Sequence, residues 1–156
     1  MEHYQHILVA LDLIDEDDEV VTERALEMAE RMGADLSIVH VIEAVFTYGA
    51  PYGPNTVCDM QENIEKSARQ KLEAWRQRLN VSSDRCFMGT GKAKNVILDT
   101  ADRLGADLIL VGSHGRHGLD ALIMGSTSKQ VVKGAKVDVM TVHVPRAEPA
   151  NTHDKA

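Results

Sequence analysis

Two short glycine-containing segments hold the residues best suited to chemistry. Residues 112–118 read Gly-Ser-His-Gly-Arg-His-Gly, and residues 125–129 read Gly-Ser-Thr-Ser-Lys. Three glycines within seven residues allow the backbone to turn tightly and to approach a ligand closely. A Gly-Ser-Thr-Ser sequence that opens a helix offers backbone N–H groups, hydroxyl groups and the positive end of the helix dipole. Together, the two segments predict a place where a phosphate group is held.

The polar groups of these segments have separable roles at such a site. The backbone N–H groups of Gly115, Ser126 and Thr127 are the candidate donors to phosphate oxygens. The hydroxyl groups of Ser126 and Ser128 are expected to assist them, and Arg116 can neutralise a terminal phosphate through a paired contact. The plainer alternative is a tight loop made by the glycines, followed by a helix that Ser126 merely caps.

Alternating strands and helices are predicted to position the two segments. The apolar runs of strand length are residues 6–11, 35–41, 84–88, 107–111 and 137–144, of which 84–88 is weak. Apolar residues at helical spacing mark residues 19–32, 60–79, 93–104 and 126–133. Gly33 is expected to end the first helix as a left-handed cap, and Trp75 to lie in the core. Residues 44–58 hold two prolines and two glycines, so an irregular loop is expected there.

This alternation predicts one α/β domain over residues 1–145, followed by a disordered tail at 146–156. The expected fold is a doubly wound, five-stranded parallel sheet of order 3-2-1-4-5 with helices on both faces. In that order the chain reverses direction between strands one and four, and ligands bind at the carboxyl ends of the strands there. The first strand ends at Asp12 and the fourth at Gly112, so the glycine segment falls where the fold independently predicts a crevice.

The ends of the first two strands complete this predicted crevice. Because the carboxylate of Asp12 repels phosphate, we expect it to meet ribose hydroxyls, a base amino group or a bridging divalent cation. Val41 ends the second strand, and we expect its side chain to form a wall for a base while its backbone meets the base edge.

Composition and charge limit the class of partner. A net charge of −7 argues against a general nucleic-acid or membrane surface, because both would attract a basic face. No apolar run approaches the roughly 18 residues of a membrane span, and no signal-peptide pattern precedes the first strand. Cys58 and Cys86 form no disulfide framework, and we expect reduced thiols in a cytoplasmic protein.

These segments resemble the nucleotide-binding pattern of the universal stress protein family. Gly112-x-x-Gly115, nine further residues and then Gly125-Ser126 reproduce that pattern. Residues 7–12, 107–116 and 142–145 are also similar to the family, and the resemblance covers about residues 4–145. It implies a flavodoxin-like fold, also described as adenine nucleotide alpha hydrolase-like. It further implies an ATP site with or without Mg²⁺, homodimerisation, and a cytoplasmic role in stress adaptation.

The family's ATP contacts, carried over by position, fall on three strand ends and on the glycine segments. They are Ala10, Leu11, Asp12, Val41, Val111, Gly112, His114, Gly115, Gly125, Ser126, Thr127 and Ser128. The chain keeps every glycine of the motif. In this respect it resembles the ATP-binding branch of the family and differs from the branch that lacks the motif. The resemblance therefore implies a nucleotide-dependent regulatory switch.

Two other classes of function stay open. In an enzyme, His114 and His117 would flank the phosphates and shuttle protons, but no paired carboxylates, nucleophile–base set or metal cluster accompanies them in the sequence. We therefore expect no dedicated catalyst, and slow ATP hydrolysis or phosphotransfer is the alternative. An interaction module that binds no nucleotide is the other class. Residues 89–92, Gly-Thr-Gly-Lys, are not a P-loop, because Cys86 stands where its first glycine belongs.

A homodimer is also expected from the order of the strands. Strand 137–144 would lie at the edge of the sheet, where a bare apolar strand favours pairing with another chain. Val142 and Val144 are expected to lie on one face and to serve a two-fold contact. The alternative is that the polar tail after Pro145 covers this edge.

Overall fold

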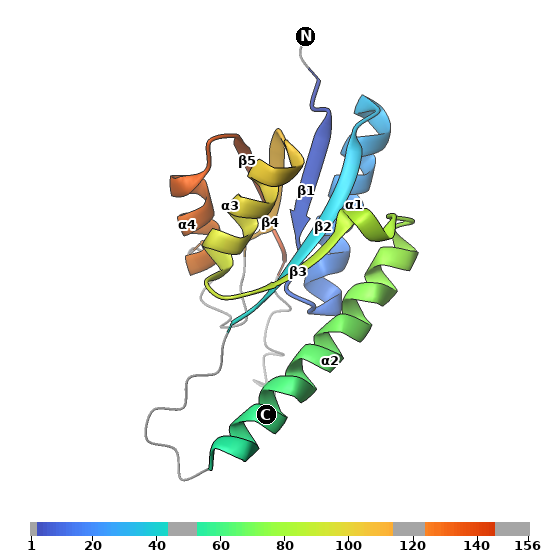
Figure 1. Cartoon of the computed structure of the whole chain (residues 1–156). Coiled ribbons are helices and arrows are strands. Elements are labelled where there is room, and N and C mark those ends of the chain that lie inside the picture. Colours follow the sequence, from blue (N-terminus) through green and yellow to red (C-terminus); the bar gives the residue numbers. More distant parts are fainter. Residues whose placement is uncertain (1–2, 44–52, 114–123, 146–156) are drawn as a thin grey trace, which may run out of the picture.

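A five-stranded parallel sheet with strand order β3-β2-β1-β4-β5 forms the centre of the chain (Figure 1). The computed structural model describes residues 3–43, 53–113 and 124–145. The strands are β1 (His6–Ala10), β2 (Asp35–Ile42), β3 (Cys86–Thr90), β4 (Leu108–Gly112) and β5 (Asp138–Val142). The helices are α1 (Asp15–Met32), α2 (Pro54–Arg78), α3 (Ala93–Leu104) and α4 (Ser126–Gly134), with a 3₁₀ turn, η1, at Ser83–Arg85. The predicted fold class and strand order are confirmed.

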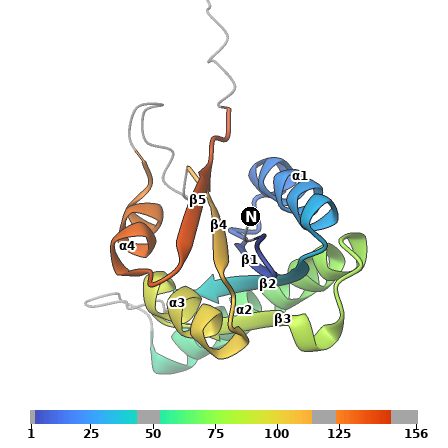
Figure 2. The ribbon, with the colours of Figure 1, turned by 90° about the horizontal axis from the view of Figure 1, so that it is seen from above.

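Helices cover both faces of the sheet, which explains the continuous apolar strands. Ile7 and Val9 of β1 pack with residues of α1 and α2, whereas Leu8 packs on the opposite face with residues of α3 and α4. Figure 2 shows α1 on one side of the strands, and α3 and α4 on the other. Alternate residues of a central strand are therefore buried on opposite faces, as the unbroken run of apolar residues predicted.

The starts of two helices differ from the boundaries expected from the sequence. α1 begins at Asp15 rather than at residue 19, because the acidic residues of its first turn suit the positive end of the helix dipole. α2 begins at Pro54, where proline is favoured at the first helical position, so residues 54–58 of the expected loop are helical. The rest of that loop, residues 44–52, lies outside the described residues. Gly33 ends α1 with a φ of 67°, which confirms the predicted left-handed cap.

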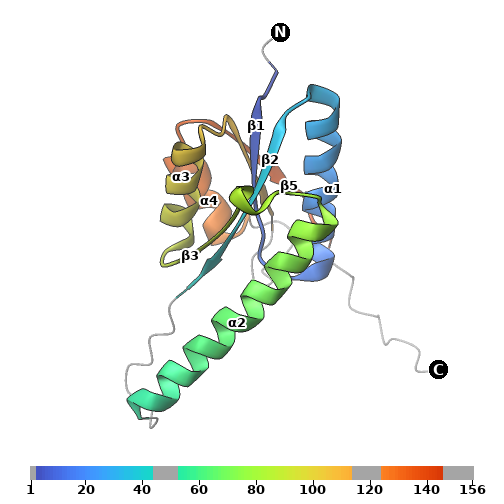
Figure 3. The same cartoon turned by 45° about the vertical axis from the view of Figure 1, so that its right-hand side comes forward.

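α2 is long and extends past the carboxyl ends of the strands (Figure 3). Its C-terminal part supplies buried residues, among them Trp75, which is 5% exposed and confirmed as a core residue. Met60 falls on the same apolar stripe by its helical spacing, yet it is 44% exposed. The difference arises because the first turns of α2 lie beyond the edge of the sheet, as Figures 1 and 3 show.

The edge strand β5 pairs with β4, and the valines at its end and two residues beyond it are buried. Val142 and Val144 are buried in the same core cluster as Leu13 and Leu110. The prediction that these two side chains serve a contact with a second copy is therefore wrong. The backbone N–H of Ser113 donates to the carbonyl of Val142 at 2.9 Å, and the backbone N–H of Val144 donates to the hydroxyl of Ser113 at 3.0 Å, which fixes this end of the strand against β4.

Candidate functional site

The ends of β1 and β4 lie side by side at the carboxyl edge of the sheet. Val9 of β1 is in register with Leu110 of β4, so the residues after Ala10 and those around Gly112 share this edge. Val41 of β2 lies at the same edge, since Ala10 is in register with Val39. The sequence-predicted residues brought together by the strands are Ala10, Leu11, Asp12, Val41, Val111 and Gly112. The predicted residues His114, Gly115 and Arg116 lie outside the described residues.

Hydrogen bonds hold the start of α4 against the end of β4. The backbone N–H of Gly125 donates to the carbonyl of Ser113 at 2.9 Å. The hydroxyl of Ser128 donates to the carbonyl of Gly112 at 2.6 Å. These bonds bring the second predicted segment, Gly125, Ser126, Thr127 and Ser128, to the same edge as the first.

The N-terminus of α4 has the properties of an anion-binding helix end. Its N-cap residue is Gly125, and no side chain caps it within the part of the chain that the structure describes. The alternative in which Ser126 caps the helix is therefore not observed; Ser126 is the first helical residue and is exposed. The first turn holds no acidic residue, so the positive end of the dipole is not neutralised there. The N–H groups of a first turn have no acceptor within their own helix, which leaves them available to a ligand.

Ser128 differs from Ser126 in its surroundings. Its side chain is buried, and its hydroxyl hydrogen is already donated to the carbonyl of Gly112. While this bond lasts, the Ser128 hydroxyl cannot donate to a phosphate oxygen, although its backbone N–H can. The hydroxyl expected to assist at a phosphate is therefore that of Ser126.

Two buried polar side chains, not selected from the sequence, hold the backbone beside Asp12. The carboxylate Oδ1 of Asp18 accepts a hydrogen bond from the backbone N–H of Asp12 at 3.0 Å. His40 Nδ1 lies 2.7 Å from the carbonyl oxygen of Leu11. Acidic runs such as residues 15–19 mostly lie in solvent, yet Asp18 is 2% exposed. Its helical spacing to the buried Val21, Thr22 and Ala25 is the signal that could have identified it.

Burial changes the acidity of Asp18. Removal of the carboxyl group from water raises the pKa of Asp18 to about 7, and the nearby charge of Asp12 acts in the same direction. Hydrogen bonds from the backbone N–H groups of Asp12 and Leu13 oppose this effect, but they are smaller. The carboxyl group that accepts from the backbone of Asp12, a predicted ligand contact, therefore titrates near neutral pH.

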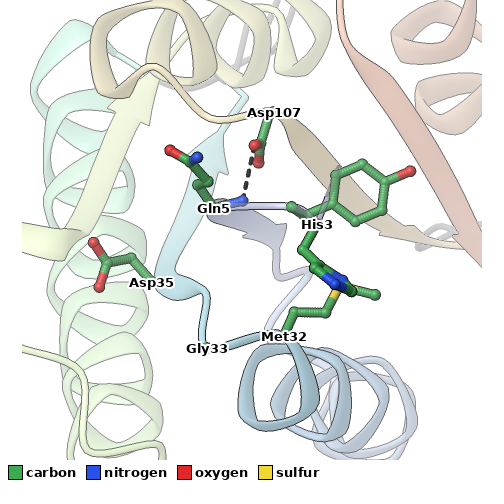
Figure 4. A pocket seen from close by; sticks show the side chains of 7 residues that line it. His3, Gln5, Met32, Gly33, Asp35 and Asp107 are labelled. Carbon is green, nitrogen blue, oxygen red and sulfur yellow. Dashed lines mark hydrogen bonds between the residues drawn. The ribbon is translucent and has the colours of Figure 1, made fainter. Parts of the chain in front are cut away.

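A large cavity lies at the opposite edge of the sheet, where the strands begin (Figure 4). Its volume is about 830 Å³, and it is lined by His3, Tyr4, Gln5, Met32, Gly33, Asp35 and Asp107. The two carboxylates already have protein partners. Asp107 accepts from the backbone N–H groups of Gln5 and His6 at 2.8 and 2.9 Å, and Asp35 pairs with Arg85 at 2.7 Å. The acidic lining is thus used to join the strand starts.

The described residues contain neither a cluster of metal-ligating side chains nor a helix that could span a membrane. Within residues 3–43, 53–113 and 124–145, no group of three or more histidine, cysteine or acidic side chains could hold a metal ion. In the same ranges, no helix has the length and apolar character needed to cross a membrane.

The sheet order and the helix end beside β4 define the class of the protein, a doubly wound, Rossmann-like α/β fold. Within that class, the model of the Universal stress protein family matches residues 3–143, and the chain belongs to this family. Universal stress protein A homolog 2 from Coxiella burnetii (strain RSA 493 / Nine Mile phase I) is 40% identical over 144 residues. The match covers 92% of this chain and 98% of that relative.

Solved structures show the same fold. Universal stress protein UspA from Lactobacillus plantarum has a TM-score of 0.75 at 25% identity, with 91% of this chain and 99% of that chain covered. A universal stress protein in complex with cAMP has a TM-score of 0.64 at 23% identity, with 92% of this chain and 100% of that chain covered.

Proposed function

We propose that this chain is a regulatory stress protein that binds an adenine nucleotide, ATP foremost, at the carboxyl edge between β1 and β4. The observation that carries the proposal is the start of α4. It has no side-chain cap among the described residues, no acidic residue in its first turn, and two hydrogen bonds that fix it beside β4. An anion is the ligand that such a helix end attracts.

An adenine nucleotide is the form of anion that the neighbouring residues and the family favour. The half-buried Asp12 is suited to ribose hydroxyls, and Val41 to the wall of a base pocket. A structural neighbour of the same fold is a complex with cAMP, which contains adenine, ribose and phosphate. ATP adds a longer phosphate chain, for which His114, Gly115 and Arg116 are the proposed contacts, and Mg²⁺ would enter with those phosphates.

We infer a regulatory role in stress adaptation rather than dedicated catalysis. Among the described residues at the carboxyl edge, the buried hydroxyl of Ser128 donates to the carbonyl of Gly112 and not to a general base. Slow ATP hydrolysis or phosphotransfer stays the alternative, because His114 and His117 lie outside the described residues. A module that binds partners without any nucleotide is the other alternative. The cytoplasmic location stays a prediction from the resemblance.

We further propose that the chain forms a homodimer through the outer edge of β5, which pairs with no other described strand. The strand has a paired neighbour on one side, β4, and the backbone of its other side is the proposed contact. A groove of about 340 Å³ runs beside this strand. It is lined by Val20, Glu23, Arg24 and Glu27 of α1 and by Met140, Thr141, Val142 and His143. A second copy would bring the same edge and groove by symmetry.

A charge placed at the α4 start tests the proposed nucleotide site. Ser126→Asp adds a negative charge to the helix end, so we expect ATP affinity measured by calorimetry to fall by about tenfold or more. Ser67→Asp adds the same charge at an exposed position of α2 and should leave the affinity unchanged. Equal ATP affinity of the two variants would exclude the start of α4 as the phosphate site. Absence of ATP binding by the unmodified protein would favour the interaction module.

A further inference from the structure

We propose that Asp18 and His40 are positioning residues that clamp one peptide unit, Leu11–Asp12, and so set the geometry of the nucleotide site. This inference rests on the proposed function. It assigns a role to two buried polar side chains that do not themselves need to touch the nucleotide.

The two side chains hold opposite ends of the same peptide unit. The carbonyl of Leu11 and the N–H of Asp12 belong to one planar amide group. His40 Nδ1 lies 2.7 Å from that carbonyl oxygen, and Asp18 Oδ1 lies 3.0 Å from that nitrogen. A carbonyl oxygen can only accept, so His40 carries a hydrogen on Nδ1 and donates it. With both ends bonded, the plane of the peptide cannot rotate without losing a buried hydrogen bond.

The clamp is rigid because both of its side chains are enclosed. Asp18 and His40 are each 2% exposed, and they come from different elements, the first turns of α1 and the end of β2. In Figure 1, α1 begins at the edge of the sheet where β1 ends, and Asp18 belongs to the first turn of α1. Two elements of the packed core therefore fix one turn at the carboxyl edge of the sheet.

The turn itself needs this support. After the backbone N–H of Leu11 donates to the carbonyl of Val39 at 2.9 Å, the chain leaves the sheet. Leu13 then adopts a φ of 60°, a left-handed conformation that costs a residue other than glycine about 1 kcal/mol or more. Such a conformation persists only where the surroundings over-determine it. The buried side chain of Leu13 and the clamped peptide before it provide that constraint.

The chemistry of Asp18 favours a positioning role over a general stabilising one. A carboxyl group buried beside other acids is costly, and the charges of Asp12 and Asp17, both carboxylates, disfavour the ionised form of Asp18. Among the described residues, Asp18 Oδ2 has no hydrogen-bond partner. An apolar residue would fill the space at lower cost, but it could not accept the N–H of Asp12.

The position of Asp12 is what the clamp controls. The nitrogen of Asp12 belongs to the clamped amide, and Asp12 lies at the carboxyl edge beside the end of β4, so a rotation of this peptide displaces its carboxylate. We propose that the contact between Asp12 and the ribose depends on this orientation. Loss of either half of the clamp should then weaken nucleotide binding without a change at α4.

The experiment compares variants that delete a clamp bond with variants that keep it. Asp18→Ala and His40→Leu remove the acceptor and the donor. Asp18→Asn keeps an oxygen at Oδ1, and His40→Asn keeps an N–H near Nδ1. Glu16→Ala, at an exposed position in the same helical turn, is the matched control. ATP affinity is measured by calorimetry, and exchange of the Asp12 amide hydrogen by NMR, both well below the unfolding temperature of each variant.

We expect the deletion variants to bind ATP about tenfold more weakly and to lose protection of the Asp12 amide. The asparagine variants and Glu16→Ala should stay within about threefold of the unmodified protein. If Asp18→Ala does not fold, His40→Leu provides the same comparison. Folded deletion variants with unchanged ATP affinity would overturn the positioning role. If the unmodified protein binds no adenine nucleotide, the proposed function fails, and amide exchange separately reports whether the clamp exists.

Discussion

At the scale of single residues, the most informative feature is the carboxyl group of Asp18, whose burial was not evident from the residues around it in the sequence. Asp18 belongs to a run of acidic residues, and such runs mostly lie in solvent. The structure buries it because its helical spacing to Val21 and Ala25 turns it toward the core. The acidic residue type therefore predicts exposure of Asp18, whereas its helical spacing predicts burial, and the structure agrees with the spacing.

The buried Asp18 makes stability depend on pH in a defined direction. Its pKa is about 7 in the folded protein against 3.8 for the free group, so the folded state holds the proton more tightly. The resulting stability is fully present below about pH 4 and is lost as the pH rises through 7, by up to about 1.4 kcal/mol per pH unit. Asp18→Asn cannot ionise, so we expect its unfolding temperature to fall less between pH 5 and 8 than that of the unmodified protein. Identical pH slopes for the two proteins would contradict the raised pKa of Asp18.

At the scale of elements, the strands were predictable and several boundaries were not. β1, β2 and β4 are buried on both faces, so their sequences are unbroken apolar runs that identify them. The start of α2 could not be predicted, because proline is common both in turns and at the first position of a helix, and Pro54 begins the helix here. The inward direction of Val142 was also not evident, because alternation alone does not say which face of an edge strand is covered.

The junction of β3 and α3 is a tightly packed element that a single methyl group should disturb. A Cβ atom at Gly89 would lie 2.5 Å from Cγ1 of Val96, a stiff β-branched side chain. We expect Gly89→Ala to reduce the free energy of unfolding by about 1–3 kcal/mol in urea titrations. Gly53→Ala is the matched control, because a Cβ there would meet no atom of the described residues within 4 Å. Equal stability of the two variants would show that the β3–α3 contact is looser than described.

At the scale of the whole molecule, the proposed homodimer depends on the outer edge of β5, the last strand in the sheet order. The carbonyl of Val142 points toward β4, where it accepts from Ser113. Backbone groups alternate in direction along a strand, so the N–H of Thr141 points to the outer edge. Thr141→Pro removes that donor, and we expect a weaker dimer by analytical ultracentrifugation with the monomer still folded. Thr141→Ala keeps the donor and should dimerise as the unmodified protein does. A monomeric mass for the unmodified protein at all concentrations would rule out the dimer.

The candidate site was predictable from the sequence only in its outline. The glycine and serine segments, with the strand order, predicted which strand ends would meet, and β1 and β4 do meet. Their supports were not predictable, because the bonds of Asp18, His40 and Ser128 join residues that only the folded chain brings together. The contacts proposed for His114, Gly115 and Arg116 stay predictions, since these residues lie outside the described ranges.

The most direct test of the central claim is a map of backbone amide shifts on addition of ATP, measured by NMR on the isotope-labelled protein. Binding at the carboxyl edge predicts shifts at Asp12, Gly112 and Ser126, at the ends of β1 and β4 and the start of α4. The amides of Gly33 and Asp35, at the opposite edge of the sheet, should not move. Shifts confined to that opposite edge, or no shifts at millimolar ATP, would contradict the proposed nucleotide site.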